Sequence, residues 1–167
     1  MKLTVRLSTH SHDGIKSIGN TMDQTPGGVL GYTSGIDTVF DRVTKKENMD
    51  GATDYRCLYI SNESTGVTIF NPKIKILTTP ASKISIGTLG KGVTAGAIAT
   101  EKSAPGGVLF KTKEEIDATS DGYIDFAGVT ELRPGESAPF WIRRQVVSTS
   151  GSGVTTEEFI FKLKYTS

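Results

Sequence analysis

Two histidines and a neighbouring aspartate form the first group whose residue types could do chemistry. His10 and His12 are the only histidines among the 167 residues, and Asp13 follows them directly. In an extended segment, residues two apart share a face, so two imidazoles and a carboxylate could approach one metal ion. The neighbouring sequence is rich in glycine and serine, and no third histidine is present to complete the site. We therefore expect a solvated segment here and no bound metal.

Motifs for phosphate binding and for nucleophilic catalysis are incomplete. Lys91 is followed by glycine instead of serine or threonine, and Ser85 occupies the place of the first phosphate-loop glycine. The Gly-Ser-Gly at residues 151–153 is a loop tip rather than the strand-to-helix turn that activates a serine nucleophile. Cys57 lies in an apolar run of a predicted strand, which favours a buried, inert thiol.

The carboxylates also lack a catalytic arrangement. Glu114, Glu115 and Asp117 fall on one predicted helical turn, whereas Glu157 and Glu158 are adjacent in a predicted strand and point to opposite faces. Neither group pairs a general acid with a general base across a cleft. We predict that the chain is not an enzyme and binds no cofactor.

One surface signal is the run from Trp141 to Arg144 in a predicted strand. If the aliphatic residues of this strand face the core, Trp141 and Arg143 face away, and an exposed tryptophan beside an arginine is typical of an interface anchor. Alternatively, loops cover that face, Trp141 belongs to a core and Arg143 stacks on an aromatic ring. The candidate interface residues are Trp141, Arg143, Arg144 and Arg56.

Charge and composition exclude several other classes of protein. The chain has 19 basic and 18 acidic residues, and a net charge of +1 gives no overall field for DNA, RNA or anionic lipid. Its 37 serines and threonines and 19 glycines favour strands and turns over a helical bundle or a coiled coil. No apolar run approaches the roughly 20 residues that span a membrane. A single cysteine excludes an intrachain disulfide.

Short alternating segments recur along the chain, separated by turn residues. In residues 54–62 apolar side chains occupy both faces, as is typical of a strand in the middle of a covered sheet. Residues 158–166 alternate between apolar side chains facing in and charged ones facing out. Other strands are expected at 1–7, 67–77, 83–89, 97–100, 107–110, 123–126 and 139–147, with a short helix after the capping box of Thr112 and Glu115. This pattern predicts an all-β fold, an antiparallel β-sandwich of jelly-roll or immunoglobulin type.

A segment of nearly thirty residues near the N-terminus, 8–35, shows no period and holds six of the nineteen glycines. We interpret residues 1–35 as a strand with an extended arm, and 36–167 as the sandwich domain. The arm is either mobile, or ordered only on a neighbouring subunit, or contains a regular element that the pattern does not reveal. Its candidate contacts are Ile15, Ile18, Val29 and Leu30.

Several short segments, taken in order, form a further pattern. They are Phe40-Asp41-x-Val43, Gly51, Asp54-Tyr55-Arg56-Cys57-x-Tyr59-x-x-Asn62, Ala104-Pro105-Gly106-Gly107-Val108 with Phe110, Leu132-x-Pro134-Gly135 and Trp141-Ile142-Arg143-Arg144. Together they span residues 36–147 and resemble small virion structural proteins of tailed bacteriophages, which also carry a Gly/Ser-rich arm ahead of this region. The charged and polar residues at 111–120 depart from that pattern.

The resemblance implies a β-sandwich subunit of the phage particle without catalytic activity. The first expectation is a capsid decoration protein that binds the head surface and stabilises it. One alternative is a tail, collar or fibre-connecting component. Another is a carbohydrate- or host-surface-binding module, with Tyr55, Tyr59, Tyr123 and Trp141 as a stacking platform. The expected partners are other copies of this chain in a homo-oligomer and the major capsid protein or tail proteins, with no nucleic acid and no membrane. The expected location is the virion, after synthesis in the bacterial host cytoplasm.

Overall fold

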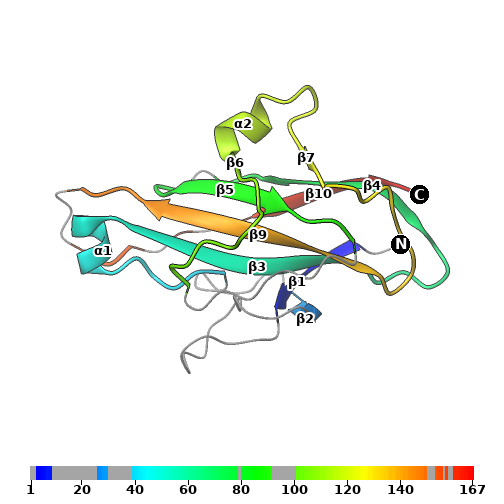
Figure 1. Ribbon diagram of the computed structural model, residues 1–167, viewed down its shortest axis with the longest axis horizontal. Helices are drawn as coiled ribbons and strands as arrows, with labels where there is room; N and C mark the ends of the chain where they lie inside the picture. The colour runs from blue at the N-terminus through cyan, green and yellow to red at the C-terminus, as the bar shows by residue number, and fades with distance from the viewer. Residues whose placement is uncertain are drawn as a thin grey trace.

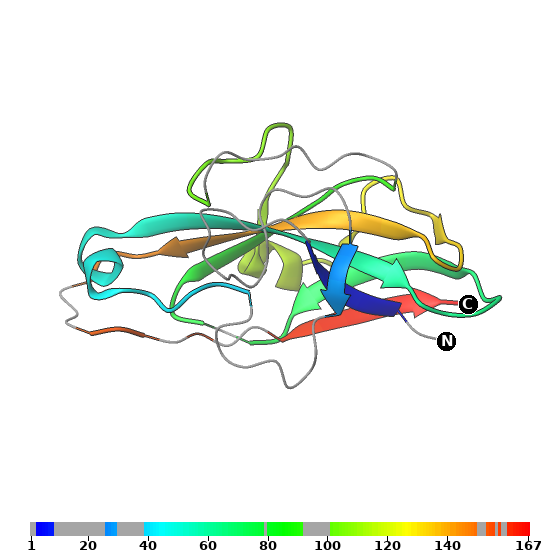
Figure 2. The same ribbon diagram turned by 90° about the horizontal axis from the view of Figure 1, so that it is seen from below.

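The computed structural model describes residues 3–8, 26–29, 39–78, 80–91, 101–149, 153–155, 157 and 160–167. In these residues two antiparallel β-sheets pack face to face (Figure 1). The sandwich is elongated, and the carboxyl end of the last strand lies at the end opposite the first helix (Figures 1 and 2). None of the helices in this part of the chain is long and apolar enough to cross a membrane.

The larger sheet has six strands in the order β2-β1-β3-β9-β5-β6. They are β1 (Leu3–Ser8), β2 (Pro26–Val29), β3 (Ala52–Asn62), β5 (Lys83–Thr88), β6 (Lys111–Thr112) and β9 (Ser137–Val146). The two longest, β3 and β9, pair from Ala52 opposite Val146 to Ser61 opposite Ser137. Because paired residues share a face of the sheet, this register decides which side chains of both strands point inward.

The smaller sheet is built around β4 (Ile69–Ile76), which lies between β10 (Phe161–Thr166) and β7 (Ile124–Asp125). The short β8 (Glu131–Leu132) pairs with the first residues of β4. Asn71, just before Pro72, has a φ of 47°, and the pairing of β4 with β10 shifts between Lys164 and Thr166. Asn71 and Pro72 therefore produce an irregularity inside one continuous strand.

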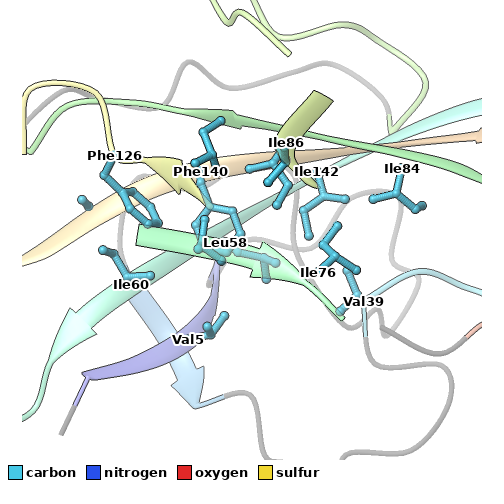
Figure 3. Close-up of a cluster of buried hydrophobic side chains, with 14 of the residues drawn as sticks. Val5, Val39, Leu58, Ile60, Ile76, Ile84, Ile86, Phe126, Phe140 and Ile142 are labelled. Atoms are coloured by element: carbon cyan, nitrogen blue, oxygen red, sulfur yellow. The ribbon is translucent and has the colours of Figure 1, made fainter. Parts of the chain in front are cut away.

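The main core lies between the sheets and is aliphatic with an aromatic centre (Figure 3). The Phe140 ring packs edge-on against Phe126 and Phe161, with ring centres 5.7 and 6.1 Å apart. Burying each large side chain contributes about 1.5–3 kcal/mol to stability. The other inward residues include Leu58, Ile60, Ile74, Ile76, Ile84, Ile86 and Ile142.

Two short helices begin at capping boxes. In α1 (Lys45–Asp50), Thr44 and Glu47 satisfy each other's backbone N–H groups. In α2 (Lys113–Asp117), Thr112 and Glu115 do the same, which confirms the expected helix. The side chain of Ile116 packs in the main core. The helix α2 itself lies at one side of the sandwich (Figure 1). The capping box of α1 is visible in the sequence, where Glu47 follows Thr44 by three residues, but this helix is not among the elements predicted from the sequence.

The all-β antiparallel sandwich is confirmed. The first predicted strand appears as β1 and pairs with β3, so it belongs to the larger sheet itself. Within the segment without a period, residues 26–29 form β2, paired with β1. The strand expected at 107–110 is wrong, because these residues cross the outer face of the sheet as a loop. The strand expected at 97–100 lies outside the described residues.

Candidate interaction surfaces

The outer face of the six-stranded sheet carries a second, smaller core. Trp141 lies opposite Cys57 on one side and Gly87 on the other. Its side chain is completely buried, together with Tyr55, Cys57 and Tyr59. Leu89, Val108 and Phe110 pack over these residues. We call residues 101–110, which supply Val108 and Phe110, the cover.

Gly87 explains how the cover approaches the sheet. A β-carbon at this position would lie 2.2 Å from Cγ1 of Val108 and 3.1 Å from the carbonyl oxygen of Leu109. Any larger residue at Gly87 would therefore push the cover away from the sheet. Glycine inside a strand often marks such a close approach of another segment.

Arg143 also faces outward and is held by the cover. Its guanidinium lies 5.0 Å from the centre of the Phe110 ring and donates to the Ser85 hydroxyl at 3.0 Å. The Phe110 ring contacts Tyr55, with ring centres 5.7 Å apart. The expectation of an exposed Trp141 is therefore wrong, because a loop covers this face, and the alternative with Arg143 stacked on an aromatic ring is correct.

The four aromatic residues expected to form a platform for stacking on carbohydrate do not lie together on the surface. Tyr55, Tyr59 and Trp141 are buried under the cover, and Tyr123 belongs to the opposite side of the molecule, beside the smaller sheet. Cys57 is fully buried, as expected for an inert thiol.

Arg56 and Arg144 point inward and are not surface residues. Arg144 donates to the Oδ2 atom of Asp54 from Nη2 at 2.7 Å and from Nε at 3.2 Å. Both guanidinium groups lie over the Phe40 ring, at 5.2 Å for Arg56 and 4.6 Å for Arg144. Asp54, Arg56 and Arg144 are each at most 3 % exposed. Their assignment to an interface is corrected: they form a buried ionic cluster between β3 and β9.

Partners of this cluster come from segments that are distant in the sequence. Arg56 pairs with Glu101 at 2.7 Å, and Lys102 bridges Asp54 at 2.9 Å and Glu47 at 3.1 Å. Glu157 reaches Arg144 at 3.7 Å and also accepts from the Ser82 backbone N–H at 2.7 Å. The ionic cluster therefore fastens α1, the cover and the segment before β10 to the larger sheet.

The sequence contains a signal for this cluster. Arg144 has the same strand parity as Phe140 and Ile142, and Arg56 has the same parity as Leu58. Side chains of one parity share a face, so these arginines had to point inward with the core residues.

Hydrogen bonds shift the pKa values of two carboxyl groups of the ionic cluster, Asp54 and Glu47. Burial would raise the pKa of Asp54, but the bonds from Arg144 and Lys102 outweigh it and lower that pKa below its ordinary value. Burial would also raise the pKa of Glu47, but hydrogen bonds from Thr44 and Lys102 outweigh burial and lower that pKa. Both carboxylates are therefore held in the ionised form.

Acid should weaken the fold through these two carboxyl groups. Each of these carboxyl groups has a lower pKa in the folded chain than in the unfolded chain, where it is about 4. Such a group stabilises the fold at pH values above its unfolded pKa. That stabilisation is lost as the pH falls through the pKa of the folded chain. We expect the free energy of unfolding, measured with urea from pH 7 to pH 3, to decline below about pH 4. The decline should be smaller in Asp54→Asn, which lacks one of the groups. Parallel curves for the two proteins would contradict this assignment.

The outer face of the smaller sheet carries a cluster of four lysines, Lys73, Lys75, Lys162 and Lys164, which we call the lysine face. On the paired strands β4 and β10, Lys73 lies directly opposite Lys164, and Lys75 lies directly opposite Lys162. The ammonium groups of Lys75 and Lys164 lie 5.1 and 5.4 Å from the centre of the Tyr123 ring. The alternation of residues 158–166 predicted the outward lysines of β10, whereas the matching pair on β4 was not singled out.

Two aspartates neutralise part of the lysine face. Asp121 pairs with Lys73 at 3.0 Å and Lys164 at 3.3 Å, and Asp125 pairs with Lys73 at 3.1 Å. Hydrogen bonds to these aspartates raise the pKa of Lys73, and the bond from Lys73 lowers the pKa of Asp121. No carboxylate of the described residues lies within ion-pair distance of Lys75 or Lys162.

Several residues singled out in the sequence lie outside the described residues, namely His10, His12, Asp13, Ile15, Ile18, Leu30 and Glu158. Val29 ends β2, opposite Arg6 of β1. In α2, Glu115 belongs to the capping box and Asp117 pairs with Lys113. Among the residues that the structure describes, no group of histidine, cysteine, aspartate and glutamate side chains is placed to hold a metal ion.

No protein-family model, no curated protein and no solved structure matches this chain. Its function must therefore be inferred from its own residues and their geometry.

Proposed function

We propose that this chain is a non-enzymatic structural subunit of a tailed-phage particle, and specifically a decoration protein that binds the capsid surface and stabilises it. The observation that supports this proposal is the position of the segments that resemble phage virion proteins. Although they are scattered over the sequence, they pack together around β3 and β9.

Two of these segments are direct neighbours. Residues 54–62 lie in β3 and residues 141–144 lie in β9, and the two strands pair along their whole length. Phe40, from the first segment, lies beneath the guanidinium groups of Arg56 and Arg144. One arginine from each strand, Arg56 of β3 and Arg144 of β9, thus builds one buried cluster.

The remaining segments contact the same two strands. Val108 and Phe110 cover the outer face of β3 and β9. Asn62 at the end of β3 donates to the Leu132 carbonyl at 2.8 Å, and its own carbonyl accepts from Gly135 at 2.9 Å. Because all these segments pack on the same two strands, we infer that the resemblance to phage virion proteins arises from a shared fold.

The polar residues of these motifs also favour a structural role over a catalytic one. Arg56, Asn62 and Arg144 are buried and use their hydrogen bonds to join segments of the chain. A decoration protein needs such a rigid framework, repeated in many copies. Its net charge of +1 limits repulsion between crowded copies in a homo-oligomer.

Immunoelectron microscopy tests the proposal. Phage particles produced from the genome that encodes this chain are labelled with an antibody raised against it. We expect label over the whole head, and we expect particles stripped of the chain to bind the purified protein again. Label confined to the tail or neck would replace the decoration role with that of a tail or collar component. Particles without label would overturn the virion proposal.

A further inference from the structure

We propose that the lysine face is the docking surface of this chain and that its partner is an acidic protein surface. This inference names the attachment surface of the proposed virion subunit and in that sense rests on the proposed function. Its first test does not require a particle.

The arrangement of charges is the first argument. Two pairs of lysines lie directly opposite each other on adjacent strands, and like charges in this position destabilise a sheet. Asp121 and Asp125 both bind Lys73, and Asp121 also binds Lys164. Lys75 and Lys162 therefore form a row whose positive charge is not neutralised by any described carboxylate. An anionic partner would remove the repulsion within that row.

Protection of a sheet edge explains only half of the pattern. Lysines on an edge strand prevent unwanted pairing with other chains, and β10 is such a strand within the described sheet. This role accounts for Lys162 and Lys164. It does not account for Lys73 and Lys75, because β4 pairs on both sides, with β10 and with β7.

The surroundings of the lysine face favour a protein partner over a nucleic acid. Two ammonium groups already occupy positions over Tyr123, so this ring is engaged and not free to stack on a base. At the two ends of β4, Phe70 is 40 % exposed and Leu77 is 48 % exposed. Protein–protein interfaces combine an apolar core with a polar rim, and these exposed apolar side chains could supply the apolar part.

The first test measures binding of the full chain to poly-L-glutamate by fluorescence anisotropy at low salt. In the variant with Lys75→Glu and Lys162→Glu, we expect the dissociation constant to rise about tenfold or more, because facing like charges repel. The control is Lys83→Glu, an exposed lysine on β5 opposite the neutral Gln145, and its change in net charge equals that of the single variant Lys162→Glu, with which it is compared directly below. An equal loss in the control would overturn the proposal. Tighter binding to single-stranded DNA, lost in the same variant, would also overturn it in favour of a nucleic-acid site.

The single variant Lys162→Glu separates binding from folding. Its carboxylate would face Lys75 across the strands, so the thermal midpoint should stay unchanged or rise. We expect this variant to bind poly-L-glutamate more weakly than the control does. Retained binding, with the fold intact, would contradict the docking role.

A second test uses particles stripped of the chain. The wild type and Lys83→Glu should bind to them again, whereas the variant with both glutamates should not. Full rebinding of that variant would overturn the docking surface while the virion proposal stands. The chain could instead be absent from particles while the lysine-face variants still bind poly-L-glutamate more weakly than the control. In that case the virion proposal fails, and the lysine face remains a surface that binds acidic polypeptides.

Discussion

Replacing Arg144 with methionine is expected to lower the free energy of unfolding by about 3–5 kcal/mol. The substitution removes the guanidinium between two buried carboxylates, Asp54 and Glu157. Asp54 keeps its contact with Lys102, but Glu157 loses its only ion partner among the described residues. Uncompensated charge in the interior costs far more than charge at the surface. Urea unfolding followed by circular dichroism measures the loss.

The matched control breaks an exposed pair. Lys46→Met removes the ion pair of Lys46 and Asp50 on α1, whose side chains are 85 and 54 % exposed. This change should lower the free energy of unfolding far less than Arg144→Met does, because solvent and salt screen an exposed ion pair. Combining Arg144→Met with Asp54→Leu should recover part of the stability, because replacing both members of a buried pair avoids the isolated charge. If Arg144→Met costs no more than Lys46→Met, the ionic cluster contributes no stability.

The sequence was sufficient to separate the two faces of the strand at 139–147, but not to choose an inward face for 54–62, where both faces are apolar. The alternation in residues 139–147 groups Phe140 with Ile142, and the structure has both in the main core. The same alternation places Trp141 and Arg143 on the outer face, which is also correct. Period-two patterning carries this information because side chains of a strand alternate between two faces.

The alternation of a strand does not predict which other segment packs over its outward face. The cover has no period of its own, and its contact with the sheet depends on a glycine that leaves room for Val108. The four lysines come from residues 73–75 and 162–164, which are about ninety positions apart, and only the pairing of β4 with β10 brings them together. Contacts between segments so distant in sequence follow from tertiary packing rather than from local pattern.

Replacing Trp141 with alanine is expected to cost about 3–5 kcal/mol of folding stability. The indole is completely buried between the larger sheet and the cover, although it lies on the outer face of that sheet. Its Nε1 atom has no hydrogen-bond partner among the described residues, so the loss comes from packing. Urea unfolding followed by circular dichroism measures the change. A variant that keeps wild-type stability would show that the cover does not pack on Trp141.

Displacing the cover without touching the tryptophan provides the independent measurement. Gly87→Ala would place a β-carbon against Val108, and this overpacking should cost about 1–3 kcal/mol. Because Trp141 is the only tryptophan, its fluorescence emission should shift to longer wavelength while the far-UV circular dichroism stays that of the wild type. Gly106→Ala is the control, since a β-carbon there meets nothing within 4 Å. Adding Val108→Ala to Gly87→Ala should reverse part of the emission shift, because the 2.2 Å contact with the Val108 methyl group is removed while the 3.1 Å contact with the Leu109 carbonyl remains. If Gly87→Ala were as silent as Gly106→Ala, the cover would not depend on contact at Gly87.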